Sequence, residues 1–235
     1  GQKLSKRDGK NNLVDFKREG ILPIAMLNYL ARLGWSYKNE EFFSEKQAIA
    51  WFSLKGIGKS PSKYDEKKLL YLNGKHLKTK NNEDLFQYFL YYLENHKDLN
   101  VDKKHQKKLK LLTFLLKDRC NSLGDLYENA KFLLFPPDES IIKKYNDIIS
   151  NETIVLIENF ISSVTLDETL WKSPAIEKFI KYFCESNKIS FPQIAIPLRV
   201  LITGSSHSAS ITEILAIIGK EDSISRLKII VMSLK

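Results

Sequence analysis

The chain has 235 residues, of which 43% are hydrophobic and 28% charged, so it is long enough for one large domain or two smaller ones and too apolar to be disordered. Its 37 lysines and arginines against 28 acidic residues give a net charge of +9, which favours a polyanionic partner such as nucleic acid, although a lysine-rich proteome has the same effect. Two isolated cysteines and four scattered histidines argue against a zinc site, and no apolar run reaches the length of a membrane span, so we expect a cytoplasmic protein.

A short basic stretch opens the chain: Lys3-Leu4-Ser5-Lys6-Arg7. Lysines spaced around a serine can bend over a polyphosphate and neutralise it. The alternative is a solvated tail, because basic segments are common at chain ends.

Four short helices are predicted in the first third of the chain, over residues 13–19, 22–34, 44–52 and 65–72. Pro23 opens the second helix, Ser44 and Asp65 are the expected N-caps of the third and fourth, and Asn73-Gly74 is expected to end the fourth. The third helix is expected to turn three apolar side chains inward: Ile49, Trp51 and Phe52.

Residues 56–60, Gly-Ile-Gly-Lys-Ser, look like half of a phosphate-binding P-loop. The motif needs a glycine at position 53, which is Ser53, and a helix where Pro61 follows. We therefore interpret the stretch as an ordinary loop.

Beyond about residue 65 the apolar residues recur with a helical period, which predicts a bundle or cage of helices. Ser190, Ser208 and Asp222 lie where N-caps are expected, and Phe135-Pro136-Pro137 is the best candidate for a linker. The predicted helices span residues 82–94, 102–119, 125–133, 139–149, 152–163, 168–185, 191–202, 209–219 and 222–234.

The helix over 102–119 joins a basic first half to an apolar second half. Residues 111–116 are expected in the core. The lysines of the first half form either a solvated face or a set of phosphate contacts: Lys103, Lys104, Lys107, Lys108 and Lys110.

In order and spacing, several of these segments resemble the bacterial glutamyl-tRNA synthetases. The basic stretch is similar to their lysine-serine-lysine loop, and residues 22–36 are very similar to the segment that follows it. The later matches are Lys59-Ser60-Pro61, Asp65, Leu72-Asn73-Gly74, Pro197-Leu198-Arg199, Thr203-Gly204-Ser205, Glu213-Ile214-Leu215 and Gly219-Lys220-Glu221.

The resemblance implies the C-terminal half of such an enzyme, without its ATP-binding catalytic domain. It implies a mainly α fold: a loop and stem-contact region with minor β structure over residues 1–78, then an all-helical anticodon-binding domain over 79–235 that divides near 135–140. The whole enzyme would join glutamate to tRNA(Glu) with ATP and Mg²⁺, and this half would contain no catalytic residue. The alternative is a free-standing, non-catalytic RNA-binding or scaffold protein.

The family's roles carry over to residues at the matching positions. Lys6, assisted by Lys3, would contact the phosphates of ATP. Arg119 would read the third anticodon base and Arg199 the first two, although a helix-dipole role for Arg119 and an internal ion pair for Arg199 remain alternatives. The adjacent base-contacting loop would use Ser208 and Ile211, but core packing is an equal alternative for Ile211, and Ala209-Ser210 stand where the family commonly has proline-glycine.

Overall fold

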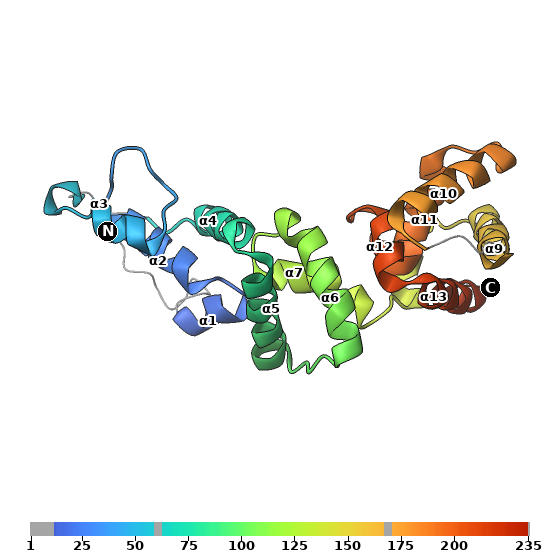
Figure 1. The fold of residues 1–235 in the computed structure, drawn as a ribbon, viewed down its shortest axis with the longest axis horizontal. Coiled ribbons are helices and arrows are strands. Elements are labelled where there is room, and N and C mark those ends of the chain that lie inside the picture. The colour runs from blue at the N-terminus through green and yellow to red at the C-terminus, as the bar shows by residue number, and fades with distance from the viewer. Residues whose placement is uncertain (1–11, 59–62, 167–170, 235) are drawn as a thin grey trace. The chain divides into compact units, whose positions relative to one another are not determined.

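The structure, a computed structural model, describes residues 12–58, 63–166 and 171–234. It is mainly α-helical, as expected (Figure 1). Within the described residues the β structure is limited to two isolated bridges, Trp35 with Ile57 and Tyr37 with Glu40, both ahead of residue 65. The α-helices are α1 (Leu13–Arg18), α2 (Pro23–Gly34), α3 (Glu45–Trp51), α4 (Glu66–Thr79), α5 (Asn82–Lys97), α6 (Lys103–Leu116), α7 (Leu123–Ala130), α8 (Glu139–Ile142), α9 (Asn151–Leu166), α10 (Ser173–Asn187), α11 (Phe191–Thr203), α12 (Ile211–Ile218) and α13 (Lys220–Ser233), with 3-10 turns η1 (Leu54–Gly56), η2 (Lys117–Arg119), η3 (Lys131–Leu133) and η4 (Lys143–Tyr145).

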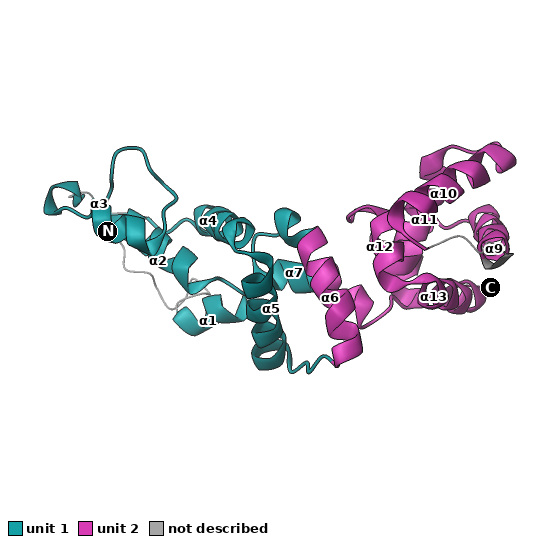
Figure 2. Ribbon diagram, in the orientation of Figure 1, with its two compact units in different colours: residues 1–101, 116–128 teal, residues 102–115, 129–235 magenta. Residues whose placement is uncertain are grey.

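The chain forms two compact units, which Figure 2 shows in different colours. The first unit comprises residues 1–101 and 116–128, and the second comprises residues 102–115 and 129–235. No helix in the described part of the chain combines the length and the hydropathy needed to cross a membrane.

The core of the first unit forms where α2 packs along α4. Ile21, Tyr29, Leu69 and Leu72 are buried there together. The Tyr29 hydroxyl accepts a hydrogen bond of 2.6 Å from the backbone N–H of Asp65, which is the N-cap of α4. Both predicted caps are confirmed: Asp65 accepts from the N–H of Lys68, and Ser44 forms a capping box at the start of α3.

The predicted break at Asn73-Gly74 is wrong, because α4 continues through both residues to Thr79. A glycine at position 74 avoids a steric clash, because a Cβ there would lie 2.4 Å from Oδ1 of Asn121. Asn73 is fully buried, and its side chain bonds backbone groups outside the helix. The pair therefore marks a close approach of two segments.

The inward orientation predicted for α3 is also wrong for two of its three residues. Ile49 and Phe52 are 73% and 58% exposed. Only Trp51 is partly covered, because its ring stacks on Tyr37 at 4.8 Å. α3 has only seven residues and packs on one side against the rest of the first unit. The apolar side chains on its other side therefore face solvent.

The second unit is organised around α11, which contacts α9, α10, α12 and α13. Ser190 caps α11 through a capping box with Gln193, as predicted. The other two predicted caps are wrong: Ser210 precedes α12, and Gly219 precedes α13, so that Asp222 lies inside the helix. Asp222 instead pairs with Lys108 of α6.

Protonation of His76 in the first unit is expected to make the stability depend on pH. Its side chain is buried, and its Nε2 lies 3.1 Å from Oδ1 of Asn28. Burial, with a smaller effect of Lys80, lowers the pKa of His76 to about 4. Between pH 6.5 and 4 the unfolded chain therefore binds more protons than the folded one, and stability falls as the pH falls.

Urea titrations between pH 7 and pH 4 should show a loss of about 2–3 kcal/mol in unfolding free energy from this group. The variant His76→Gln keeps a side-chain donor for Asn28 and should lose most of that pH dependence. His207→Gln, at an exposed position, should leave it unchanged. Equal pH profiles for the wild type and His76→Gln would contradict the assignment.

Candidate nucleic-acid interface

Arg199 projects from the central helix α11 toward the loop that follows it. Its helical neighbours Leu198 and Val200 are fully buried, whereas Arg199 itself is half-buried. Its Nη1 donates a hydrogen bond of 3.4 Å to the backbone carbonyl of Ser206. This bond is long but directs the guanidinium toward the loop, and a planar guanidinium suits recognition of a planar hydrogen-bonding edge.

The loop over residues 204–210 is ordered by its own polar groups. The Thr203 hydroxyl donates to the carbonyls of Arg199 (2.8 Å) and Ser205 (3.2 Å), and the Ser205 hydroxyl donates to the carbonyl of His207 (2.8 Å). Gly204 ends α11 with φ +73°, and a Cβ there would lie 3.0 Å from Cγ2 of Ile141. Glycine thus provides both the turn and the space.

Two other predicted site residues share this region with Arg199. Ser208 is half-buried, and its hydroxyl donates to the carbonyl of Ala209. Ile211 is only 2% exposed in the first turn of α12, so in this conformation the packing alternative describes it, and a role in base contact stays a prediction. The polar groups that do line the exposed side of the loop, Ser206 and His207, were missed by sequence reasoning. A run of four small or polar residues before an N-cap was the available signal.

Arg119 belongs to the first unit, not to the unit that holds Arg199. It is exposed at the end of η2, directly before the buried Cys120. Burial raises the pKa of the Cys120 thiol to about 12, which fits a packing role for that side chain. This is the position expected of a side chain that projects from the end of a helical element.

The basic residues elsewhere divide into paired and exposed groups. Lys108 donates to the carbonyl of Ile218 and pairs with the carboxylate of Asp222, so it has a role inside the protein. Its ammonium group lowers the pKa of the Asp222 carboxyl. Lys103, Lys104 and Lys107 are exposed along α6. Lys3 and Lys6, predicted to contact ATP phosphates, lie outside the described residues.

Comparison with known proteins gives matches over the whole chain. Residues 83–231 match the family model described as anticodon binding domain, and residues 1–71 match the catalytic domain of class I tRNA synthetases (E and Q). A glutamate–tRNA ligase 2 of Wolbachia pipientis is 38% identical over 98% of this chain and 49% of its own length. The glutamate–tRNA ligase of Pelagibacter ubique is 35% identical over 94% of this chain and 47% of its own.

A solved structure gives the same result. The glutamate tRNA ligase of Elizabethkingia meningosepticum, determined in complex with its amino acid, superposes with a TM-score of 0.81 at 26% identity and covers 100% of this chain and 49% of its own. The chain therefore spans about half the length of the relatives that it matches. Since the family model covers more than half of its residues, this chain belongs to the anticodon binding domain family.

Proposed function

We propose that this chain is the tRNA-binding part of a glutamate–tRNA ligase, and that residues 79–235 read the anticodon. The observation that carries the proposal is the match of residues 83–231 to the anticodon binding domain, within which Arg199 extends toward an ordered, polar loop. Unpaired RNA bases are recognised by arginine planes and by hydrogen bonds to their edges. The net charge of +9 supports an RNA partner.

Within this proposal the remaining predicted residues have separate tasks. Arg119 reads the third anticodon base, Arg199 the first two, and the loop with Ser208 and Ile211 completes the contact. Residues 1–78 hold the stem of tRNA(Glu), and the domain over 79–235 divides near 135–140. The similarity to glutamate–tRNA ligases supports a tRNA partner for this chain.

For the reaction, Lys6 and Lys3 bind the phosphates of ATP. The whole enzyme joins glutamate to tRNA(Glu) with ATP and Mg²⁺ in the cytoplasm. An ammonium group near the leaving pyrophosphate stabilises the charge that develops as glutamate attacks. The match of residues 1–71 to the class I catalytic domain supports this role for the segment.

Replacing Arg199 by glutamine tests the proposal directly. Filter binding of the chain to a tRNA(Glu) transcript should show a loss of about 1–3 kcal/mol in binding free energy, because one base contact is removed. A transcript with changed first and second anticodon bases should bind the wild type and the variant equally. Arg119→Gln should lose only its preference at the third base.

Lys178→Gln is the matched control, because it removes one positive charge from an exposed position of the same unit. It should change the affinity for both transcripts alike and by less. Binding by the wild type should weaken steeply with salt. If the wild type did not distinguish tRNA(Glu) from the transcript with an altered anticodon, the proposed reading function would be wrong.

A further inference from the structure

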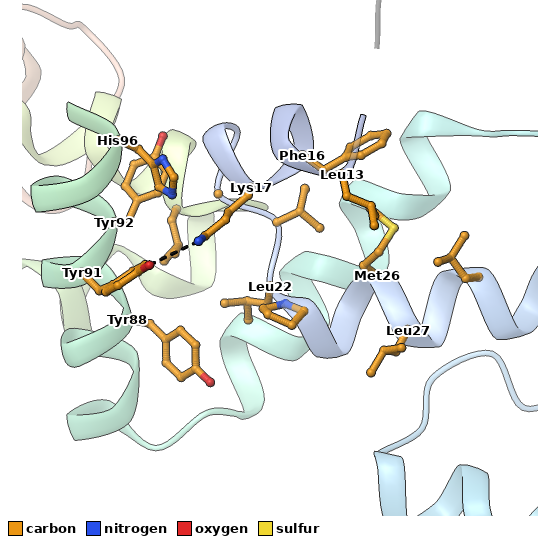
Figure 3. Close-up of a pocket in the computed structure, with 15 residues that line it drawn as sticks. Leu13, Phe16, Lys17, Leu22, Met26, Leu27, Tyr88, Tyr91, Tyr92 and His96 are labelled. Atoms are coloured by element: carbon orange, nitrogen blue, oxygen red, sulfur yellow. Dashed lines mark hydrogen bonds between the residues drawn. The ribbon is translucent and has the colours of Figure 1, made fainter. Parts of the chain in front are cut away.

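An apolar pocket of about 440 Å³ lies in the first unit between α5 and the segment that carries α1 and α2 (Figure 3). Leu27 and Leu30 form part of its wall although they are 57% and 48% exposed. Tyr88 and Tyr91 of α5 are also partly exposed to it. The volume falls within the usual range for small-molecule sites, and such sites combine apolar walls with a few polar groups.

The polar groups of this pocket gather at its α5 side. In Figure 3, Lys17, Tyr91 and His96 lie near one another, whereas Leu13, Phe16 and Met26 lie toward the other side. The Lys17 ammonium donates a hydrogen bond of 3.2 Å to the Tyr91 hydroxyl and lies 5.3 Å from the centre of its ring. Among the residues that the structure describes, no acidic residue lines the pocket and Lys17 has no carboxylate partner. One end of an apolar pocket therefore carries an uncompensated positive charge.

His96 supplies a second polar group at this end. Its Nε2 is buried and has no hydrogen-bond partner among the described residues. Its ring lies against Tyr92 at 5.5 Å. Burial first, and then the nearby Lys17, Arg18 and Lys97, lower the pKa of His96, which favours its neutral form beside Lys17. A buried polar atom without a partner is costly, and a ligand with a hydrogen-bonding group would remove that cost.

We propose that this pocket binds a small aromatic anion, with the flat apolar body against Leu27, Leu30 and Phe16, the anionic group at Lys17, and a hydrogen bond to the Nε2 of His96. The proposal follows from the charge of the polar end and from the absence of acidic residues in the wall. It concerns the first unit alone and does not depend on anticodon reading.

A matched pair of fluorescent probes tests the charge requirement. 8-Anilinonaphthalene-1-sulfonate carries an anionic group on an aromatic body, and N-phenyl-1-naphthylamine has the same skeleton without the charge. The anionic probe should bind saturably at one site per chain, about tenfold more tightly than the neutral one. Lys17→Met should remove this advantage while leaving the affinity for the neutral probe within twofold.

Three further variants make the test specific. Lys46→Met, at an exposed position of α3 in the same unit, should leave both affinities unchanged. Leu27→Trp, which places a larger side chain in the pocket, should weaken both probes, and His96→Phe should weaken the anionic probe in particular. Circular dichroism checks that each variant is folded.

Three results would overturn the proposal. They are equal binding of the two probes, an equal effect of Lys17→Met and Lys46→Met, and a dimer, detected by sedimentation, that excludes the probe. The last would assign this surface to a second copy of the chain. Filter binding of tRNA(Glu) to Lys17→Met, measured separately, keeps the result distinct from the anticodon-reading function.

Discussion

Replacing Asn73 by leucine is expected to lower the unfolding free energy of the first unit by about 3–4 kcal/mol. The Asn73 Oδ1 accepts a hydrogen bond of 2.8 Å from the buried backbone N–H of Leu22. Its Nδ2 donates to the carbonyls of Asn121 (2.6 Å) and Gly20 (3.4 Å). Leucine has a similar size but offers no hydrogen bond, so the buried N–H of Leu22 and the partly buried carbonyl of Asn121 would lose this partner. The carbonyl of Gly20 would keep its bond from the N–H of Leu123.

The measurement is urea unfolding followed by tryptophan fluorescence. Trp35 and Trp51 lie in the first unit, and Trp171 lies in the second. In a Trp171→Phe background the fluorescence therefore reports the first unit alone. Asn95→Leu is the matched control, because Asn95 is exposed on α5 and its side chain donates to the carbonyl of Tyr91 within its own helix. It should change stability by less than about 0.5 kcal/mol. Equal effects of the two substitutions would show that Asn73 does not join these segments.

Asn73 also shows where sequence reasoning about the fold fails. An Asn-Gly pair usually ends a helix or forms a turn, and this local rule predicts a break in α4. The contacts that override it come from Leu22 and Asn121, which are 51 and 48 residues away. Local pattern carries no information about such partners. By contrast, the caps at Ser44, Asp65 and Ser190 depend on residues three positions away, and all three were predicted correctly.

For the candidate site, the resemblance pointed to Arg199, with an internal ion pair as the alternative for an arginine on an apolar helix. What the sequence did not show is the loop that receives it. The direction of the Arg199 side chain depends on the carbonyl of Ser206, and the shape of the loop depends on Gly204 against Ile141. Both depend on tertiary packing of segments separated in the chain. The roles of Arg119, Arg199, Ser208 and Ile211 came from family resemblance and stay predictions until binding is measured.

The pocket in the first unit likewise depends on tertiary packing that the sequence pattern does not show. The apolar residues of α2, among them Met26, Leu27, Tyr29 and Leu30, recur at helical spacing. In the structure Tyr29 is buried against α4, whereas Leu27 and Leu30 face the pocket. An amphipathic pattern identifies apolar side chains but not whether protein or an open hollow faces them. The difference only becomes visible once α5 is placed beside α2.

Replacing Arg226 by methionine is expected to destabilise the second unit by about 3 kcal/mol. From α13 its guanidinium reaches η3, where Nη1 donates to the carbonyl of Phe132 (2.7 Å) and Nη2 to that of Leu133 (2.8 Å). Burial lowers the pKa of Arg226, partly offset by Asp222, so the charge is held at a desolvation cost that these two bonds offset. Methionine keeps the apolar stem but leaves both carbonyls without their donor. Trp171 fluorescence in a chain with Trp35 and Trp51 replaced by phenylalanine reports this unit.

Two further variants separate geometry from charge at Arg226. Arg226→Lys should recover about half of the loss, because one ammonium cannot align with two carbonyls as a planar fork does. Lys228→Met removes a charge from an exposed position of the same helix and should have little effect.

Arg226 bonds η3, and η3 packs on α11, which carries Arg199, so the substitution is made close to the proposed anticodon-reading surface. Well below the unfolding temperature, however, Arg226→Met should bind tRNA(Glu) within about twofold of the wild type, because the folded fraction remains near one. A binding loss as large as that of Arg199→Gln would instead mean that Arg226 itself shapes the loop.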